Sequence, residues 1–176
     1  MSALGEEIKG MIAANGPISV ERFMELALAH PEYGYYMNRD PFGAAGDFTT
    51  APEVSQMFGE LIGLWAAEVW SQMGSPNPVR LIELGPGRGT LMSDALRAAR
   101  LTPDFRAAVD VILVETSPKL AQIQYEALST CGVAVSWQPS FAEAPAGPAI
   151  FIANEFLDAL PVRSTCSQAG AGASGW

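Results

Sequence analysis

Three alternating glycines follow a short apolar segment, and an acidic residue stands two positions before the first of them. The expected strand, residues 79–84, leads into the pattern Glu83-x-Gly85-x-Gly87-x-Gly89. Glycine lets the backbone turn sharply and approach a ligand without an intervening Cβ, and the following helix offers N–H groups at its start. Dinucleotide sites prefer G-x-G-x-x-G, whereas this spacing suits a phosphate-free ligand with an amino-acid end and a ribose. We therefore predict S-adenosylmethionine as the cofactor, with a ligand-free tight turn as the alternative.

A second acidic residue, Glu115, closes the next expected strand, residues 109–115. An acid at this place can accept hydrogen bonds from both ribose hydroxyls, as in dinucleotide sites. The alternative is a solvated acid at a strand end. An NAD-dependent oxidoreductase is a rival interpretation of the loop, but it would need the longer glycine spacing, which is absent.

These residues require a parallel sheet to bring them to one edge. Continuous apolar segments at 79–84, 109–115, 133–137 and 149–153 are separated by the expected helices 90–100 and 117–129, the second capped by Ser117. This alternation predicts an α/β fold with a Rossmann-like parallel sheet and helices on both faces. Ligands bind such sheets beyond the carboxyl ends of the strands.

Helical periodicity also precedes the sheet. We expect helices over 4–14, from the cap Ser19 to about His30, and from Thr50 to Gly74, where Thr50 and Glu53 have capping-box spacing. His30 is interpreted as a helix-end residue. Trp65 and Trp70 are expected in the core.

Four stretches are similar to the MidA-like family of class I S-adenosylmethionine-dependent methyltransferases, which includes the mitochondrial complex I assembly protein arginine methyltransferase. They are PEYGYY at 31–36, GDFTTAPEVS at 46–55, ELGPGRGTL at 83–91 and ANEFLDALPVR at 153–163. The resemblance covers about 16–163. It implies symmetric dimethylation of an arginine in a respiratory complex I subunit.

The resemblance assigns cofactor roles to the residues already singled out and adds a lid segment. It implies that Glu83 and the three glycines form the cofactor loop and that Glu115 holds the ribose. The lid near the cofactor would contribute a glycine, an acid and two hydroxyls, namely Gly46, Asp47, Thr49 and Thr50. Thr50 can serve the lid and the helix cap at once.

The segment after the fourth strand faces the transferred methyl group in class I enzymes. A protonated guanidinium is a poor nucleophile, and carboxylates can orient it and accept its proton. We expect Glu155 and Asp158, three residues apart, to clamp the guanidinium and Asn154 to orient it. The alternatives are a helix cap for Asn154 and a first-turn acid for Asp158.

Composition limits the partners. Ten basic and 19 acidic residues give a net charge of −9, which disfavours nucleic acid and suits a basic protein substrate. Cys131, Cys166 and His30 are too few for a zinc site. The N-terminus resembles no leader and no apolar run approaches a membrane span, so we expect a cytoplasmic bacterial protein without membrane insertion.

We expect three parts along the chain. Residues 1–75 form an N-terminal helical extension with the lid, and 76–163 form the first part of the methyltransferase domain. Residues 164–176, small and glycine-rich, are expected to be an aberrant or disordered tail on a C-terminally truncated chain. A non-catalytic assembly or interaction protein that binds S-adenosylmethionine stays open beside the enzyme.

Overall fold

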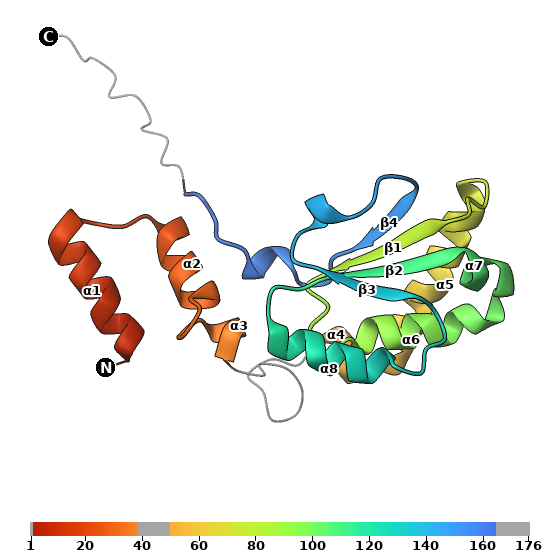
Figure 1. Cartoon of the computed structure of the whole chain (residues 1–176), viewed down its shortest axis with the longest axis horizontal. Coiled ribbons are helices and arrows are strands. Elements are labelled where there is room, and N and C mark those ends of the chain that lie inside the picture. The colour runs from red at the N-terminus through yellow and green to blue at the C-terminus, as the bar shows by residue number, and fades with distance from the viewer. Residues whose placement is uncertain (1, 39–49, 165–176) are drawn as a thin grey trace, which may run out of the picture.

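A computed structural model describes residues 2–38 and 50–164, and its centre is a four-stranded parallel sheet (Figure 1). The strands are β1 (Val79–Leu84), β2 (Val109–Val114), β3 (Val135–Gln138) and β4 (Ala149–Ile152), in the order β3-β2-β1-β4. β1 pairs with β2 on one side and with β4 on the other. The α/β fold expected from the alternating pattern is therefore confirmed.

The two faces of the sheet bury different side chains of the same strands. Leu81, Val111 and Ile150 belong to the larger core cluster, while Ile82 and Ile112 belong to a smaller cluster on the opposite face. Because side chains alternate along a strand, each central strand must be apolar at nearly every position. This explains the continuous apolar runs in the sequence.

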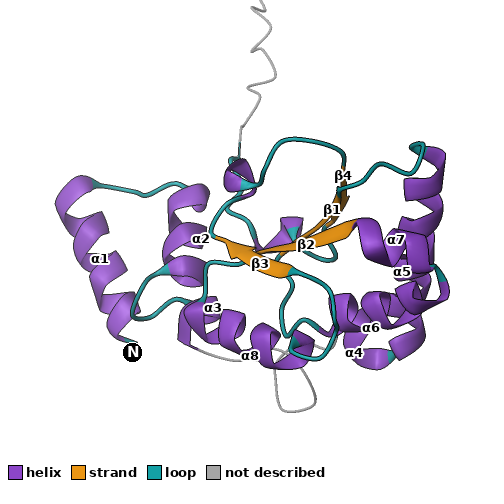
Figure 2. Cartoon of the chain, turned by 45° about the vertical axis from the view of Figure 1, so that its right-hand side comes forward, coloured by secondary structure: helices purple, strands orange, loops and turns teal. Residues whose placement is uncertain are grey.

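Four helices pack near the sheet: α5 (Gln56–Gln72), α6 (Thr90–Ala98), α7 (Pro103–Ala108) and α8 (Pro118–Leu128). All four contribute to the larger cluster, and α5, α6 and α8 lie along one face of the sheet (Figure 2). Helical cover was expected on both faces. In the part of the chain that the structure describes, the other face meets loop residues such as Ala144 instead.

Helix α5 fits closely against α6 because small residues lie between them. Any Cβ added at Gly63 would collide with the backbone of Ala95, and one at Gly59 would collide with Leu91 and Asp94. The last turn of α5 contains the buried Trp70, whose indole N–H donates to the Pro76 carbonyl at 2.9 Å. Helix α5, which precedes residue 76, is thus packed into the core of the sheet module. The proposed domain boundaries themselves stay a prediction.

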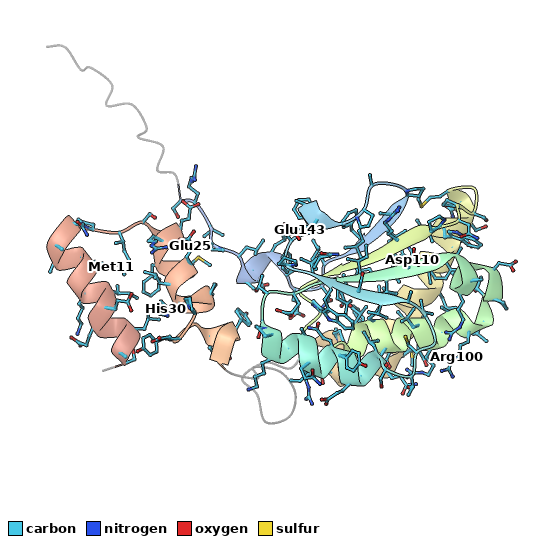
Figure 3. The ribbon with its side chains drawn as sticks, viewed as in Figure 1. Met11, Glu25, His30, Arg100, Asp110 and Glu143 are labelled. Atoms are coloured by element: carbon cyan, nitrogen blue, oxygen red, sulfur yellow. The ribbon has the colours of Figure 1, made fainter. Side chains whose placement is uncertain are left out.

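The N-terminal helices are α1 (Ala3–Asn15), α2 (Val20–Ala29), α3 (Tyr35–Asn38) and α4 (Ala51–Val54). α1 and α2 lie to one side of the sheet module (Figure 1). His30 follows the last residue of α2, as expected, and Figure 3 labels it between α1 and α2. Its Nε2 lies 3.4 Å from Oε2 of Glu7 of α1. Arg163 pairs with Glu21 of α2 at 3.2 Å, so the chain after the sheet returns to these helices.

Several details differ from the expectations. The helix expected from Thr50 to Gly74 is interrupted at Ser55, which is extended with φ of −149°, and Thr50 makes no side-chain cap. Helix α7 was not foreseen. Trp65 is 51% exposed rather than part of the core, because it lies on the side of α5 away from α6. No helix among the described residues is long and apolar enough to cross a membrane.

Candidate cofactor site

The glycine loop after β1 turns by placing all three glycines in the left-handed region. The φ angles are 63° at Gly85, 55° at Gly87 and 80° at Gly89. Gly89 is also the N-cap of α6, so the turn delivers the chain directly to the start of that helix. Side chains rarely adopt such φ values, which is why the alternating glycines are needed here.

Gly85 has a second reason to lack a side chain. A Cβ at this position would lie 2.6 Å from Cδ2 of Phe156, which follows β4. The ring therefore packs against the first glycine of the loop. Phe156 thus joins the loop to the segment proposed for catalysis, a contact that sequence spacing does not reveal.

Glu83 is buried beside this loop with part of its carboxyl group unpartnered. Glu83 is 3% exposed. Among the described residues, its Oε2 is the single buried side-chain oxygen or nitrogen that has no hydrogen-bond partner. Burial raises the pKa of Glu83 from 4.5 to about 8. An unpaired buried acceptor is unfavourable, so this oxygen is suited to receive a donor or a cation from a ligand.

Glu115 is held by its neighbours at the end of β2. Its Oε1 accepts from the Ser117 backbone N–H at 2.8 Å, and its Oε2 accepts from Nε2 of Gln124 at 3.0 Å. Burial raises the pKa of Glu115, while the hydrogen bonds from Ser117 and Gln124 act against that rise. Glu115 is thus a largely buried, hydrogen-bonded acid and not the solvated acid of the alternative interpretation. Each oxygen retains a lone pair for another donor.

Gln124 and Trp137 were missed in the sequence. Gln124 is fully buried on α8, and its side-chain amide contacts Glu115, the Gly87 carbonyl and the Trp137 indole. One signal pointed to it: Leu120, Gln124 and Leu128 recur every four residues and are all buried. A glutamine within an apolar helical stripe indicates a buried polar partner.

A pocket opens between the glycine loop and α4. Its lining includes Thr50, Glu53, Glu83, Gly87, Thr90 and Asn154. Glu53 accepts a hydrogen bond of 2.6 Å from the Thr90 hydroxyl instead of capping its own helix. Thr50 lines the pocket, and its part in covering the cofactor stays a prediction. Gly46, Asp47 and Thr49 lie outside the described residues.

The three residues proposed for catalysis are separated by a backbone irregularity. Asn154 lines the pocket, but Glu155 has a φ of 49° and Phe156, not Asn154, precedes the short helix Leu157–Ala159. Glu155 and Asp158 are exposed and do not share a continuous helical turn, so the expected common helical face is wrong. Burial raises the pKa of Tyr36 on α3, and the charge of Asp158 raises it further by a smaller amount.

The observed groups fit S-adenosylmethionine. Its ammonium and sulfonium are cationic, and Glu83 presents an unpartnered acidic oxygen beside a loop of three glycines with left-handed backbone. Glu115 stands at the end of the adjacent strand, where ribose hydroxyls are bound in related sheets. A parallel sheet with this loop and this acid defines a class I type of methyltransferase site.

Comparison with known proteins agrees with this class. Residues 61–173, more than half of the chain, match the family model described as "Putative S-adenosyl-L-methionine-dependent methyltransferase". The chain belongs to this family. The match reaches residue 173, beyond Arg163, where we expected the resemblance to end.

Individual relatives are more specific. The chain is 41% identical over 179 residues to the Danio rerio mitochondrial protein arginine methyltransferase NDUFAF7, covering 90% of this chain and 42% of the relative. The chain is 37% identical over 174 residues to the Homo sapiens protein of that name, and the alignment covers 86% of this chain and 40% of that relative. The chain thus spans about two fifths of the length of these relatives.

A solved structure shows the same fold with a related ligand. It is a Burkholderia thailandensis protein, a methyl transferase candidate bound to S-adenosyl-homocysteine, with a TM-score of 0.78 and 30% identity. The alignment covers 90% of this chain and 42% of that protein. The cofactor expected from the glycine loop is therefore confirmed at the level of the family.

One expectation is overturned by the comparisons. We expected a cytoplasmic bacterial protein because residues 1–10 lack leader features, yet the relatives from Danio rerio, Drosophila melanogaster and Homo sapiens are named as mitochondrial. The N-terminal residues of this sequence are therefore not a guide to its location.

Proposed function

We propose that the protein transfers a methyl group from S-adenosylmethionine to an arginine side chain of another protein. The observation that carries this proposal is the pairing of the left-handed glycine loop with the unpartnered carboxyl oxygen of Glu83. The relatives, which are named protein arginine methyltransferases, support the choice of substrate class.

The chain would hold the cofactor with two acids on neighbouring strands. Glu83 would ionise toward the cationic amino-acid end, and Glu115 would accept from ribose hydroxyls with its remaining lone pairs. The loop of Gly85, Gly87 and Gly89 would let the cofactor lie against backbone. Thr50 at the pocket rim, together with Gly46, Asp47 and Thr49, would complete the cover, as in the family that this sequence resembles.

The segment after β4 would position the arginine. When bound, the cofactor supplies an electrophilic methyl group on a sulfonium. Asn154 would orient the guanidinium, and Glu155 and Asp158 would hold it and accept the proton that it loses as its nitrogen is methylated. Substrate binding would have to bring these two exposed acids to one guanidinium, because they do not share a helical face in the free chain.

The partner would be a protein with an accessible arginine. A net charge of −9 favours encounter with basic segments. From the family resemblance we further propose a respiratory complex I subunit as the target and symmetric dimethylation as the product.

Side-by-side calorimetric titration with S-adenosylmethionine and NAD tests the cofactor. We expect heat of binding from the first and none from the second, and the reverse would overturn the proposal. Methyl transfer is then followed with labelled cofactor and a protein extract, and the labelled amino acids are separated after hydrolysis. Label in symmetric dimethylarginine is expected, while label confined to lysine would contradict the substrate class.

The catalytic acids need variants that respect the backbone. Asparagine tolerates positive φ better than most residues, so Glu155→Asn removes the carboxylate without adding the strain of alanine. We expect Glu155→Asn and Asp158→Asn each to reduce methyl transfer about a hundredfold with cofactor affinity unchanged. Glu68→Gln, on the exposed side of α5, is the matched control. Undiminished transfer by Glu155→Asn would remove that residue from the mechanism.

A further inference from the structure

One buried amide connects the two halves of the proposed cofactor site. Nε2 of Gln124 donates to Oε2 of Glu115 at 3.0 Å and to the Gly87 carbonyl at 2.8 Å. A primary amide has two N–H groups, so both bonds form at once. The acid after β2 and the loop after β1 are therefore held at a fixed separation by a side chain from α8.

The orientation of this amide is itself fixed. The Trp137 indole N–H donates to Oε1 of Gln124 at 2.9 Å. Indole nitrogen is a donor only, so the amide oxygen must face Trp137 and the amide nitrogen must face the acid and the loop. A rotated amide would place its oxygen against the carboxylate and the carbonyl, and three acceptors would then lack donors.

Packing restricts the same side chain. Gln124 is fully buried, and a Cβ at Gly89 would lie 3.4–3.6 Å from its Cα, Cβ and Cγ atoms. These are ordinary van der Waals distances, so Gln124 lies directly beside the last glycine of the loop. Its position depends on α8, β3 and the loop together.

We propose that Gln124 is a positioning residue that orients the Glu115 carboxylate toward the cofactor ribose and sets its distance from the glycine loop, with Trp137 fixing the orientation of the amide. This inference rests on the cofactor site described under the proposed function. It adds a specific consequence: the preference for a ribose hydroxyl depends on a residue that does not itself contact the ribose.

The decisive measurement compares two ligands in calorimetric titrations, S-adenosylhomocysteine and its 2′-deoxy analogue. Wild type is expected to prefer the ribose ligand about tenfold, the order of one charge-assisted hydrogen bond. Gln124→Met keeps the side-chain length but loses all three polar contacts. It should bind S-adenosylhomocysteine about tenfold more weakly and lose less affinity for the deoxy analogue, which offers Glu115 only the 3′-hydroxyl, so that the preference for the ribose ligand falls.

A merely structural role predicts another pattern. If Gln124 only supports the fold, both ligands weaken by the same factor and the preference survives, which overturns the inference. If wild type binds neither ligand, the proposed cofactor site fails before Gln124 is tested. Gln122→Met, an exposed substitution on the same helix whose amide contacts Glu126, is the matched control and should leave both affinities unchanged.

A double-mutant cycle tests the part assigned to Trp137. Trp137→Phe removes the donor that orients Gln124 and should weaken the ribose preference by several-fold. In the Gln124→Met background the same change should have no further effect on that preference. Additive losses would contradict the proposal. Trp137→Phe also provides the ligand comparison if thermal unfolding shows that Gln124→Met does not fold.

Discussion

The hydroxyl of Thr90 donates a hydrogen bond of 2.6 Å to Oε1 of Glu53, across 37 positions of the sequence. Thr90 is the first residue of α6 after the glycine loop, and Glu53 lies in α4. Both line the candidate cofactor pocket. The bond therefore ties the segment that follows the proposed lid to the loop that would hold the cofactor.

Thr90→Val tests this connection. Valine has nearly the same shape but no hydroxyl, so Glu53 loses its donor and the free energy of unfolding should fall by about 1–3 kcal/mol. Cofactor affinity should fall as well, because α4 is no longer held against the pocket. Chemical denaturation and calorimetry measure the two effects. Thr130→Val, at an exposed threonine, is the control, and equal behaviour of the two variants would refute this role.

Gly85→Ala should damage the loop for two independent reasons. The φ of 63° is unfavourable for alanine, and the new Cβ would collide with the Phe156 ring. We expect a loss of about 1–3 kcal/mol in unfolding free energy, with cofactor binding lost in calorimetry. Gly10→Ala in α1 has no atom within 4 Å of the new Cβ and should instead stabilise by about 0.5–1 kcal/mol.

The tryptophans of α5 should respond unequally to replacement. Trp70→Phe loses the hydrogen bond to the Pro76 carbonyl and leaves a void in the core, so unfolding free energy should fall by about 1–3 kcal/mol. Trp65→Phe replaces a half-exposed ring and should change the free energy of unfolding by less than about 0.5 kcal/mol. Denaturant titration of both variants decides, and a larger loss for Trp65→Phe would contradict the packing described.

Features governed by neighbours in the sequence could be predicted. The strands follow from apolar runs, and the caps Ser19 and Ser117 accept from the backbone N–H groups of Arg22 and Leu120 as local capping rules require. The glycine loop could be predicted as well, because alternating glycines indicate a backbone with positive φ angles. Pro103 at the first position of α7 was a usable signal that was overlooked.

Features that depend on the assembled fold could not be predicted. The apolar spacing continues across Ser55, so periodicity does not show that the helix breaks there. Glu53 has the spacing of a capping box but finds a better-placed donor in Thr90. Nothing in the residue type of Glu155 indicates a left-handed backbone. These choices among competing partners are made by tertiary contacts.

Stability should depend on pH through Glu83. Its pKa is about 8 in the fold and 4.5 ordinarily, so between these values the unfolded chain ionises while the folded chain stays protonated. The unfolded state then binds fewer protons, and the free energy of unfolding should fall as pH rises from 4.5 to 8. Glu83→Gln cannot ionise at this position, so its free energy of unfolding should fall less steeply with pH. Part of the fall that is left comes from Glu115, whose pKa the fold also raises.

The same acid should couple cofactor binding to proton release. At pH 7 the free protein holds Glu83 largely protonated, and a cationic ligand beside its unpartnered oxygen favours the carboxylate. Binding of S-adenosylmethionine should therefore release close to one proton more from wild type than from Glu83→Gln. Titrations in phosphate and Tris, which differ in ionisation enthalpy, measure this difference. Identical buffer dependence in the two proteins would show that Glu83 does not ionise toward the cofactor.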